Sequence, residues 1–262
     1  DVRTLLETRD AQDPDSLRAA LIDEALMKFT AAVNPEDPAP KFLDGVKAAR
    51  EILRQMLECR NGSSAPDMYC FGHSHIDVAW LWPLAETERK CARTFATQLT
   101  LMEEYPEYRF LQSQPHLYRM TQRLYPDLYG RIQDAAKRGQ WIPEGALWVE
   151  PDTNVSGGES LIRQFVHGKR FFREEFGVVC ELMWLPDVFG YSGALPQIMA
   201  GCDIRFFSTQ KIMWTYNGGD PFPYNTFWWE GIDGTRVFAH IHNDYNSQTN
   251  PETLNRRWKE RV

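Results

Sequence analysis

The first 66 residues predict a pair of amphipathic helices followed by a linker, after a charged, weakly patterned start at residues 1–12. Asp13-Pro14 favours a helix start, because aspartate caps free amide groups and proline fits the first turn. Apolar stripes at helical spacing are formed by Leu17, Leu21, Ala25 and Phe29, and then by Phe42, Val46, Ala49, Leu53 and Met56. Gly, Ser and Pro are concentrated at 61–67, as is typical of a linker. We therefore interpret residues 1–66 as a helical lead-in and linker.

From residue 67 onward, short apolar runs alternate with helical patterns. The predicted strands are 68–72, 108–112, 141–145, 181–185 and 204–208, and the predicted helices are 84–104, 115–138 in two pieces, 157–176 and 193–201. Repeated strand–helix units predict an α/β fold with a parallel sheet or barrel, whose functional side chains gather at the carboxyl ends of the strands. Two later runs, 226–229 and 236–241, are separated by short polar turns. We interpret them as an excursion from the barrel.

Composition narrows the class of protein. The chain has 262 residues, of which 43% are hydrophobic and 25% charged, as in ordinary globular proteins. A net charge of −7 makes nucleic acid or an anionic membrane a poor partner, and no apolar run approaches the length of a membrane span. The five cysteines include no Cys-x-x-Cys pair, and no signal peptide opens the chain. We expect a cytoplasmic protein.

The first candidate site follows the predicted strand at 68–72, where residues 72–80 read Gly-His-Ser-His-Ile-Asp-Val-Ala-Trp. His75 and Asp77 are two residues apart, and in a tight turn both side chains can reach one ion. A nitrogen ligand with an oxygen ligand suits zinc among other divalent metals. A lone His-x-Asp is also consistent with a hydrogen-bonded pair, and a second stretch bears on that choice.

The second stretch is Leu-Pro-Asp-Val-Phe-Gly-Tyr-Ser at 185–192. Asp187 follows an apolar strand immediately, so it occupies the same kind of position as His75 and Asp77. An isolated aspartate after proline is consistent with a turn or a helix cap. Two strand ends that together carry His, Asp and Asp are much harder to explain as caps, and they predict a shared metal site.

These motifs resemble those of the glycoside hydrolase family 38 α-mannosidases. Residues 72–80 are similar to the metal-site signature of that family, and residues 185–192 to its nucleophile motif. A third block, Glu-Gly-Ala-Leu-Trp-Val-Glu-Pro-Asp-Thr-Asn at 144–154 followed by Ser-Gly-Gly-Glu-Ser at 156–160, also resembles the family. The resemblance covers roughly 67–250, and the helical lead-in resembles that of the cytosolic-type members.

The resemblance implies a retaining, zinc-dependent α-mannosidase with a (β/α)7-barrel catalytic domain, of which residues 67–262 would be the N-terminal part. His75, Asp77 and Asp187 take the places of three ligands of one zinc ion, and Asp187 is also the expected nucleophile. The family's second metal-binding histidine and its acid/base aspartate match nothing in this chain. We therefore expect an incomplete barrel with little or no activity of its own.

The resemblance also suggests residues that contact the sugar. Trp80 matches the aromatic residue beside the metal, and Lys211 lies where the family often places a basic residue near the nucleophile, although lysine here makes a bidentate arginine role doubtful. Asp152 is either a turn former or a substrate contact. Tyr245 belongs to a loop that resembles a substrate loop, and His242 in the same loop is a less favoured fourth zinc ligand.

The expected substrate is a mannose-containing oligosaccharide, and the complete protein is expected to be a homo-oligomer. Two other functions remain open at this point. One is a metal-dependent carbohydrate deacetylase-like hydrolase, which would need more histidine ligands near the His-x-Asp pair. The other is a non-catalytic carbohydrate-binding domain that keeps a remnant site. His73 is interpreted as a buried structural histidine, with a role in orienting a ligand as the alternative.

Overall fold

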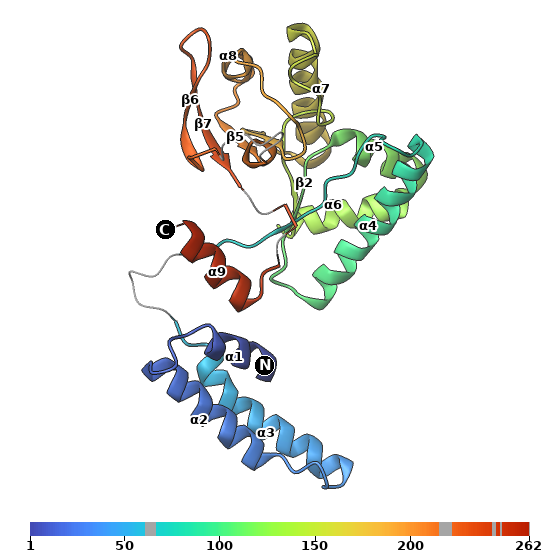
Figure 1. Cartoon of the computed structure of the whole chain (residues 1–262). Helices are drawn as coiled ribbons and strands as arrows, with labels where there is room; N and C mark the ends of the chain where they lie inside the picture. The colour runs from blue at the N-terminus through green and yellow to red at the C-terminus, as the bar shows by residue number, and fades with distance from the viewer. Residues whose placement is uncertain (61–66, 215–221, 243–244, 247, 262) are drawn as a thin grey trace. The chain divides into compact units, whose positions relative to one another are not determined.

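A computed structural model of the chain describes residues 1–60, 67–214, 222–242, 245–246 and 248–261. It contains two compact units, which we call the helical unit (Asp1–Tyr69 with Asn246–Val262) and the α/β unit (Cys70–Tyr245) (Figure 1). The last residues thus group with the helices. The expected division into domains at 1–66 and 67–262 stays a prediction, because compactness alone does not define a functional boundary.

The described part of the helical unit consists of four helices: α1 (Val2–Asp10), α2 (Leu17–Ala32), α3 (Ala39–Leu57) and α9 (Pro251–Arg261). Its small core is formed by Leu5, Ile22, Ala25 and Leu53. Ala49 and Leu53 are buried on α3, in agreement with the predicted stripe of that helix. Helix α1 lies in the segment for which the sequence pattern predicts no element.

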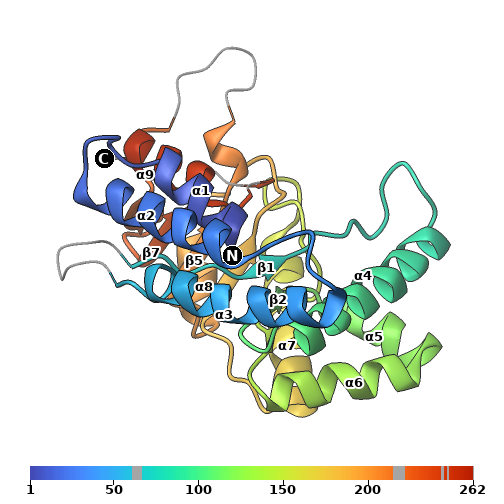
Figure 2. The ribbon, with the colours of Figure 1, turned by 90° about the horizontal axis from the view of Figure 1, so that it is seen from below.

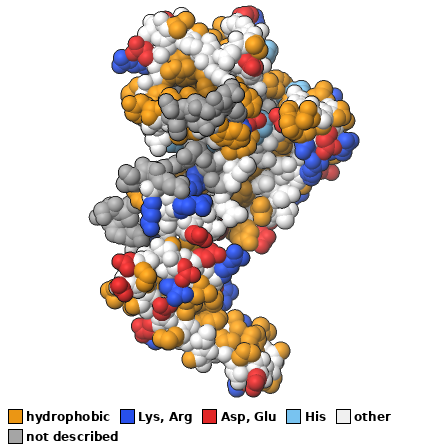
Figure 3. Space-filling model, in the orientation of Figure 1, with side chains coloured by type: hydrophobic (Ala, Val, Ile, Leu, Met, Phe, Trp, Pro, Cys, Tyr) orange, Lys and Arg blue, Asp and Glu red, His pale blue; other side chains and the backbone are white. Residues whose placement is uncertain are grey.

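The start and the buried face of α2 differ from the prediction. Ser16 is the cap, and its hydroxyl accepts the amide of Ala19 at 3.2 Å. Asp13 instead accepts the amide of Asp15 in the preceding turn. Leu17 is 76% exposed and Leu21 is half exposed. The predicted stripe is wrong at these two residues, because the helix packs through Ala19, Ile22 and Ala25. Hydrophobic side chains accordingly reach the surface of this unit (Figure 3).

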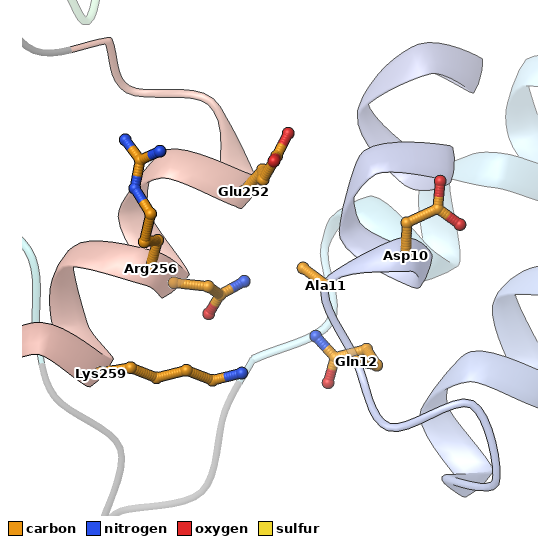
Figure 4. Close-up of a pocket in the computed structure, with 7 residues that line it drawn as sticks. Asp10, Ala11, Gln12, Glu252, Arg256 and Lys259 are labelled. Carbon is orange, nitrogen blue, oxygen red and sulfur yellow. The ribbon is translucent and has the colours of Figure 1, made fainter.

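Helix α9 packs against α1, and a polar pocket lies between α9 and the end of α1 (Figure 4). The pocket is lined by Asp10, Ala11, Gln12, Glu252, Asn255, Arg256 and Lys259. Acidic and basic groups are present in equal number, so the lining gives no preference for an anion or a cation.

The α/β unit alternates short strands and helices. Its strands are β1 (Gly72–His73), β2 (Phe110–Gln112), β3 (Trp141–Pro143), β4 (Leu182–Leu185), β5 (Phe206–Thr209), β6 (Thr226–Glu230) and β7 (Arg236–Ile241). Its helices are α4 (Leu84–Glu104), α5 (Pro115–Leu124), α6 (Pro126–Lys137), α7 (Gly158–Phe176) and α8 (Leu195–Gly201), with the 3-10 turn η1 (Lys211–Met213). The α/β class is therefore confirmed. The predicted strand at 68–72 is wrong before Gly72, since Met68, Tyr69 and Phe71 are exposed.

The parallel strands form two sheets. One has the order β1-β2-β3, and the other has the order β4-β5-β7-β6. All pairs are parallel except β6 with β7. The amide of Trp184 in β4 donates to the carbonyl of Gly145, just after β3, at 3.3 Å. The two sheets are thus neighbours at the carboxyl end of β3.

Strand β7 corrects one prediction. The run at 236–241 was expected to belong to an excursion from the barrel. The structure instead places β7 beside β5 and parallel to it, from Phe206↔Phe238 to Thr209↔Ile241. Only β6 has the character of an excursion, as an antiparallel partner of β7 whose side chains alternate between half-buried and exposed.

Aromatic contacts link β1 to the second sheet. The ring centroids of His73 and Trp184 are 5.1 Å apart, and Trp184 stacks on His242 at 5.1 Å with the ring planes 15° apart. The indole of Trp184 also donates to Nε2 of His73 at 3.1 Å. Trp184 of β4 therefore contacts both His73 of β1 and His242, the residue after β7.

Helices pack on these sheets through a shared apolar core. Helices α4, α5 and α6 contact one another (Figures 1 and 2). The core joins these helices, α7 and α8 to the strands, and its largest fully buried side chains include Trp141, Tyr118, Phe95, Phe110, Phe165 and Phe172. Across the described residues, no helix combines the length and the apolar character that a bilayer crossing requires.

Helix α7 depends on a glycine where it crosses the loop after β3. A Cβ added at Gly168 would lie 2.1 Å from the carbonyl oxygen of Ala146, so the helix and this backbone meet with no room for a methyl group. We expect Gly168→Ala to destabilise the protein by about 1–3 kcal/mol, the usual cost of overpacking. Urea unfolding measures this change.

Gly130 in α6 is the matched control, because a Cβ there meets nothing within 4 Å. Gly130→Ala should leave stability unchanged or raise it by about 0.5–1 kcal/mol, since alanine favours a helix. Equal effects of the two substitutions would contradict the close approach of α7 to this loop.

His73 should make the stability of the protein depend on pH. Desolvation, followed by the neighbouring His75 and His242, lowers the pKa of His73 from 6.5 to about 3. Below pH 6.5 the unfolded chain binds a proton that the folded chain does not, so stability is complete above that pH and falls as the pH drops toward 3. The expected loss from this residue is about 1 kcal/mol between pH 7 and 5.5.

The measurement compares urea unfolding of the parent and of His73→Gln at several pH values in the presence of EDTA. Glutamine keeps an acceptor for the indole of Trp184 but does not titrate. The difference in unfolding free energy between the two proteins should therefore shrink as the pH falls. A difference that stays constant between pH 7 and 5.5 would show that His73 is not held neutral.

Candidate metal centre

The candidate residues lie in loops that follow four parallel strands and the turn after a fifth. His75 and Asp77 follow β1, and Asp187 follows β4. Lys211 is the first residue of η1, just after β5, and Tyr245 follows β7. A further acidic residue, Glu150, lies in the loop after β3. The carboxyl ends of parallel strands in both sheets thus bring together residues far apart in sequence, as expected for α/β folds.

His75, Asp77 and Asp187 converge on one point. Nε2 of His75 is 3.1 Å from Oδ1 of Asp77 and 3.2 Å from Oδ2 of Asp187. One ligand atom from each of the three residues lies within 4.8 Å of the others. Within the described ranges, this is the group of His, Cys, Asp and Glu side chains that could hold a metal ion.

The donor set fits a divalent cation. Two ligand atoms that each lie about 2.1 Å from a tetrahedral zinc ion are roughly 3.4 Å apart, close to the separations of Nε2 from the two carboxylates. Three carboxyl groups, those of Asp77, Glu150 and Asp187, lie 3.0–3.2 Å from the ring nitrogens of His75, and Lys211 contacts Asp187. An added divalent cation would reduce this excess of negative charge, and imidazole with carboxylate is a common zinc ligand set.

Neutral side chains hold the backbone around His75 in place. Gln112 donates to the carbonyl of Ser74 at 3.2 Å, and Gln114 donates to that of Ile76 at 3.0 Å. From α4, the hydroxyl of Thr87 donates to the carbonyl of Asp77 at 2.8 Å. These three donors are buried and carry no charge. They fix the loop without competing with the carboxylates for a cation.

Glu150 is the functional candidate that sequence reasoning missed. Its side chain is 4% exposed, and Oε2 lies 3.0 Å from Nδ1 of His75. Its own amide donates to Oε1 of Gln114 at 3.3 Å, which connects it to the loop after β1 through a second route. The sequence did mark the block at 144–154, which includes Glu150. Nothing in that block indicates that the loop folds back onto His75.

Asp187 has a different environment at each carboxylate oxygen. Oδ2 faces His75, whereas Oδ1 is 2.7 Å from Nζ of Lys211, whose side chain is 5% exposed. The ammonium of Lys211 lies 3.4 Å from the ring centroid of Trp214 and 4.2 Å from that of Tyr245. Aromatic faces therefore surround a cation that points at one oxygen of Asp187.

Burial and charge set the protonation of the centre. Burial lowers the pKa of His75, but Glu150, Asp77 and Asp187 outweigh this effect and raise the pKa to about 9. Burial, and then the charge of Asp187, raise the pKa of Tyr245 above its ordinary value. The hydroxyl of Tyr245 consequently stays protonated beside the carboxylate of Asp187.

Two predicted substrate residues lie apart from these contacts. Trp80 is 66% exposed, and its aromatic contact within the described chain is an edge-on one with Trp82 at 5.4 Å. Asp152 is exposed, and its carboxylate accepts the amides of Asn154 and Val155, which is the turn-forming alternative. Their roles toward a sugar stay predictions.

The other histidines of this region lie beside the metal group. His242 is stacked on Trp184, and its Nδ1 is 3.3 Å from the hydroxyl of Ser208. It does not belong to the group that includes His75, Asp77 and Asp187. His73 accepts the indole N–H of Trp184 through Nε2, whereas the structural interpretation had it donate to a backbone carbonyl.

The sequence of this chain is similar to those of known glycosyl hydrolases. The family described as "Glycosyl hydrolases family 38 N-terminal domain" matches residues 65–262. "Alpha-mannosidase 2C1" of Homo sapiens is 47% identical over 218 residues, which is 83% of this chain and 21% of the human protein. "Alpha-mannosidase G" of Dictyostelium discoideum is 46% identical over 203 residues, 77% of this chain and 18% of that protein. The chain thus spans about a fifth of the length of these relatives.

A solved structure, that of an alpha-mannosidase from Enterococcus faecalis V583, superimposes with a TM-score of 0.61 at 22% sequence identity. The superposition covers 73% of this chain and 22% of the bacterial one, and it shows a shared fold. The family match covers well over half of the chain, including the loops with His75, Glu150, Asp187 and Lys211. The chain belongs to glycosyl hydrolase family 38.

Proposed function

We propose that the protein is a retaining, zinc-dependent α-mannosidase that hydrolyses terminal α-mannosides of oligosaccharides. The observation that carries this proposal is the convergence of His75, Asp77 and Asp187 at the ends of β1 and β4, in a chain whose relatives are named alpha-mannosidases. The deacetylase-like alternative would need further histidine ligands, and the described residues offer one histidine to the group.

In this proposal, His75, Asp77 and Asp187 hold one zinc ion. A bound zinc ion would act as a Lewis acid toward sugar hydroxyl groups and favour a distorted ring. Within the described residues, no fourth side chain joins this group. Lys211 and Tyr245 contribute through Asp187, because the ammonium of Lys211 contacts Oδ1 of its carboxylate and the phenol of Tyr245 lies beside it.

Asp187 would act as the nucleophile of a double displacement. A carboxylate oxygen forms a bond to the anomeric carbon while the glycosidic carbon–oxygen bond breaks, and the leaving oxygen takes a proton from a general acid. Water then cleaves the glycosyl ester and restores the carboxylate. We expect the general acid about 5–5.5 Å from the nucleophile, as in other retaining enzymes.

The cysteines support a reducing compartment. Cys59, Cys70, Cys91, Cys180 and Cys202 are all unpaired, and two of them are buried. Unpaired cysteines are typical of proteins in a reducing environment. We propose a cytoplasmic location on this basis. A homo-oligomer of the complete protein stays a prediction.

Substitution of Asp187 tests the proposed nucleophile in the intact protein. Asp187→Asn keeps the shape of the side chain and removes its charge, so turnover of an activated α-mannoside should fall by about 10⁴-fold or more. Glu159→Gln is the control, since Glu159 is an exposed residue of α7 paired with Arg163. Near-normal turnover by Asp187→Asn would show that another carboxylate attacks the sugar.

The stereochemistry of the product tests the retaining mechanism independently. Double displacement inverts the anomeric carbon twice, so an α-mannoside should first release α-mannose. Proton NMR within the first minutes of the reaction detects the anomer before mutarotation. Initial release of β-mannose would indicate a single displacement by water and would leave Asp187 without a nucleophilic role.

Zinc binding tests the ligand set. His75→Gln and Asp77→Asn each remove a metal ligand. Loss of a residue that only hydrogen-bonds to a ligand lowers metal affinity roughly 10–100-fold, so loss of a ligand itself should lower zinc affinity by more than that. Competition with a chelator measures the dissociation constant. His167→Gln, an exposed histidine of α7, is the control and should bind zinc as the parent does. Unchanged affinity in both ligand variants would contradict the proposed centre.

A further inference from the structure

Glu150 has a buried carboxylate that the catalytic scheme above does not use. Its side chain is 4% exposed, and its ion-pair partner among the described residues is His75. Burying a carboxylate is costly unless it is paired, and buried pairs of this kind gather at functional sites. We therefore expect the role of this buried carboxylate to involve its partner His75.

The two nitrogens of His75 face different partners. Nδ1 lies 3.0 Å from Oε2 of Glu150, an ion-pair contact whose angle does not meet hydrogen-bond geometry in this structure, and Nε2 lies 3.1 and 3.2 Å from Asp77 and Asp187. Nδ1 and Nε2 lie on opposite sides of the imidazole ring. Glu150 is therefore behind the ring, and it does not belong to the group that could hold the ion.

We propose that Glu150 is a positioning residue, which accepts the Nδ1–H of His75 and thereby leaves Nε2 as the nitrogen that binds the metal. This inference rests on the proposed zinc site. It states that Glu150 helps to set the affinity of that site for zinc. A histidine ligand whose other nitrogen donates to a carboxylate is held in one tautomer and one ring orientation and is more basic.

The surroundings of Glu150 support an orienting role. Gln114 accepts the amide of Glu150 and donates to the carbonyl of Ile76, next to His75. The hydroxyl of Thr153 donates to the carbonyl of Gly190, which ties the loop of Glu150 to the loop of Asp187 at 2.8 Å. The loop after β3 is thus fixed to both loops that carry the proposed ligands.

The test uses the intact protein with Glu150→Gln, Glu150→Leu and the control Glu159→Gln. Glutamine keeps the shape and a neutral acceptor, whereas leucine removes the acceptor. Zinc affinity, measured by chelator competition, should fall about 10–100-fold in Glu150→Gln and further in Glu150→Leu, with the control unchanged. The visible spectrum of the cobalt-substituted protein should change in the same order, since it reports ligand geometry.

A purely structural role gives the opposite pattern. The variants would then lose thermal stability in EDTA while the folded fraction keeps the zinc affinity and cobalt spectrum of the parent. That result would overturn the inference. If Glu150→Leu does not fold, Glu150→Asp replaces it, because the shorter carboxylate keeps the charge and withdraws from Nδ1. Parental zinc affinity in folded Glu150→Gln and Glu150→Asp would also overturn it.

The failure of the proposed function has a different signature. If the parent protein binds no zinc, the proposal of a zinc site is wrong. The contact between Glu150 and His75 is then tested separately, by NMR of the metal-free protein labelled with ¹⁵N-histidine. A slowly exchanging Nδ1 proton of His75 that is lost in the leucine variant, or weakened in Glu150→Asp, supports the contact. An Nδ1 proton that exchanges equally fast in the parent and the variant overturns it.

Discussion

The crowding of carboxylates around one imidazole is the constraint on which the arrangement of the α/β unit depends. Asp77, Glu150 and Asp187 each place an oxygen within 3.0–3.2 Å of a ring nitrogen of His75. The ligand oxygens of Asp77 and Asp187 lie within 4.8 Å of each other, and like charges at that range repel in a partly buried site. The carboxylates can stay close to one another only if positive charge lies nearby and the backbone of their loops cannot move apart. Lys211 supplies a permanent positive charge, and Gln112, Gln114 and Thr87 supply the rigidity without adding charge.

The local parts of this arrangement could be predicted from the sequence. His75, Asp77 and Asp187 come within a few residues of the ends of predicted strands, and parallel strands bring such positions together. The break between α5 and α6 and the end of α7 could also be predicted, because Pro126 opens one helix and Gly177 ends the other in a left-handed conformation. Each of these features depends on a few consecutive residues, which is the range over which sequence patterns are informative.

The parts that escaped prediction depend on contacts between distant segments. Alternation in 236–241 indicates a strand but not its partner, so the parallel pairing of β7 with β5 was missed. The apolar face of α2 was placed on Leu17 and Leu21 because periodicity defines a stripe but not which edge of it meets α1 and α3. Glu150 was missed for the same reason, since its role requires the loop after β3 to reach a histidine 75 residues earlier in the chain.

The environment of Asp187 explains why a lysine suits this centre. A bidentate arginine would contact both carboxylate oxygens and would compete with a metal ion for Oδ2. An ammonium group is a point charge, and here it contacts Oδ1 alone. Lysine is normally flexible, but its ammonium contacts the ring faces of Trp214 at 3.4 Å and Tyr245 at 4.2 Å, which favour this position. One oxygen of Asp187 thus faces the side of His75, and the other is held by a cation. That division is what a carboxylate needs if it is to serve both as a ligand and as a nucleophile.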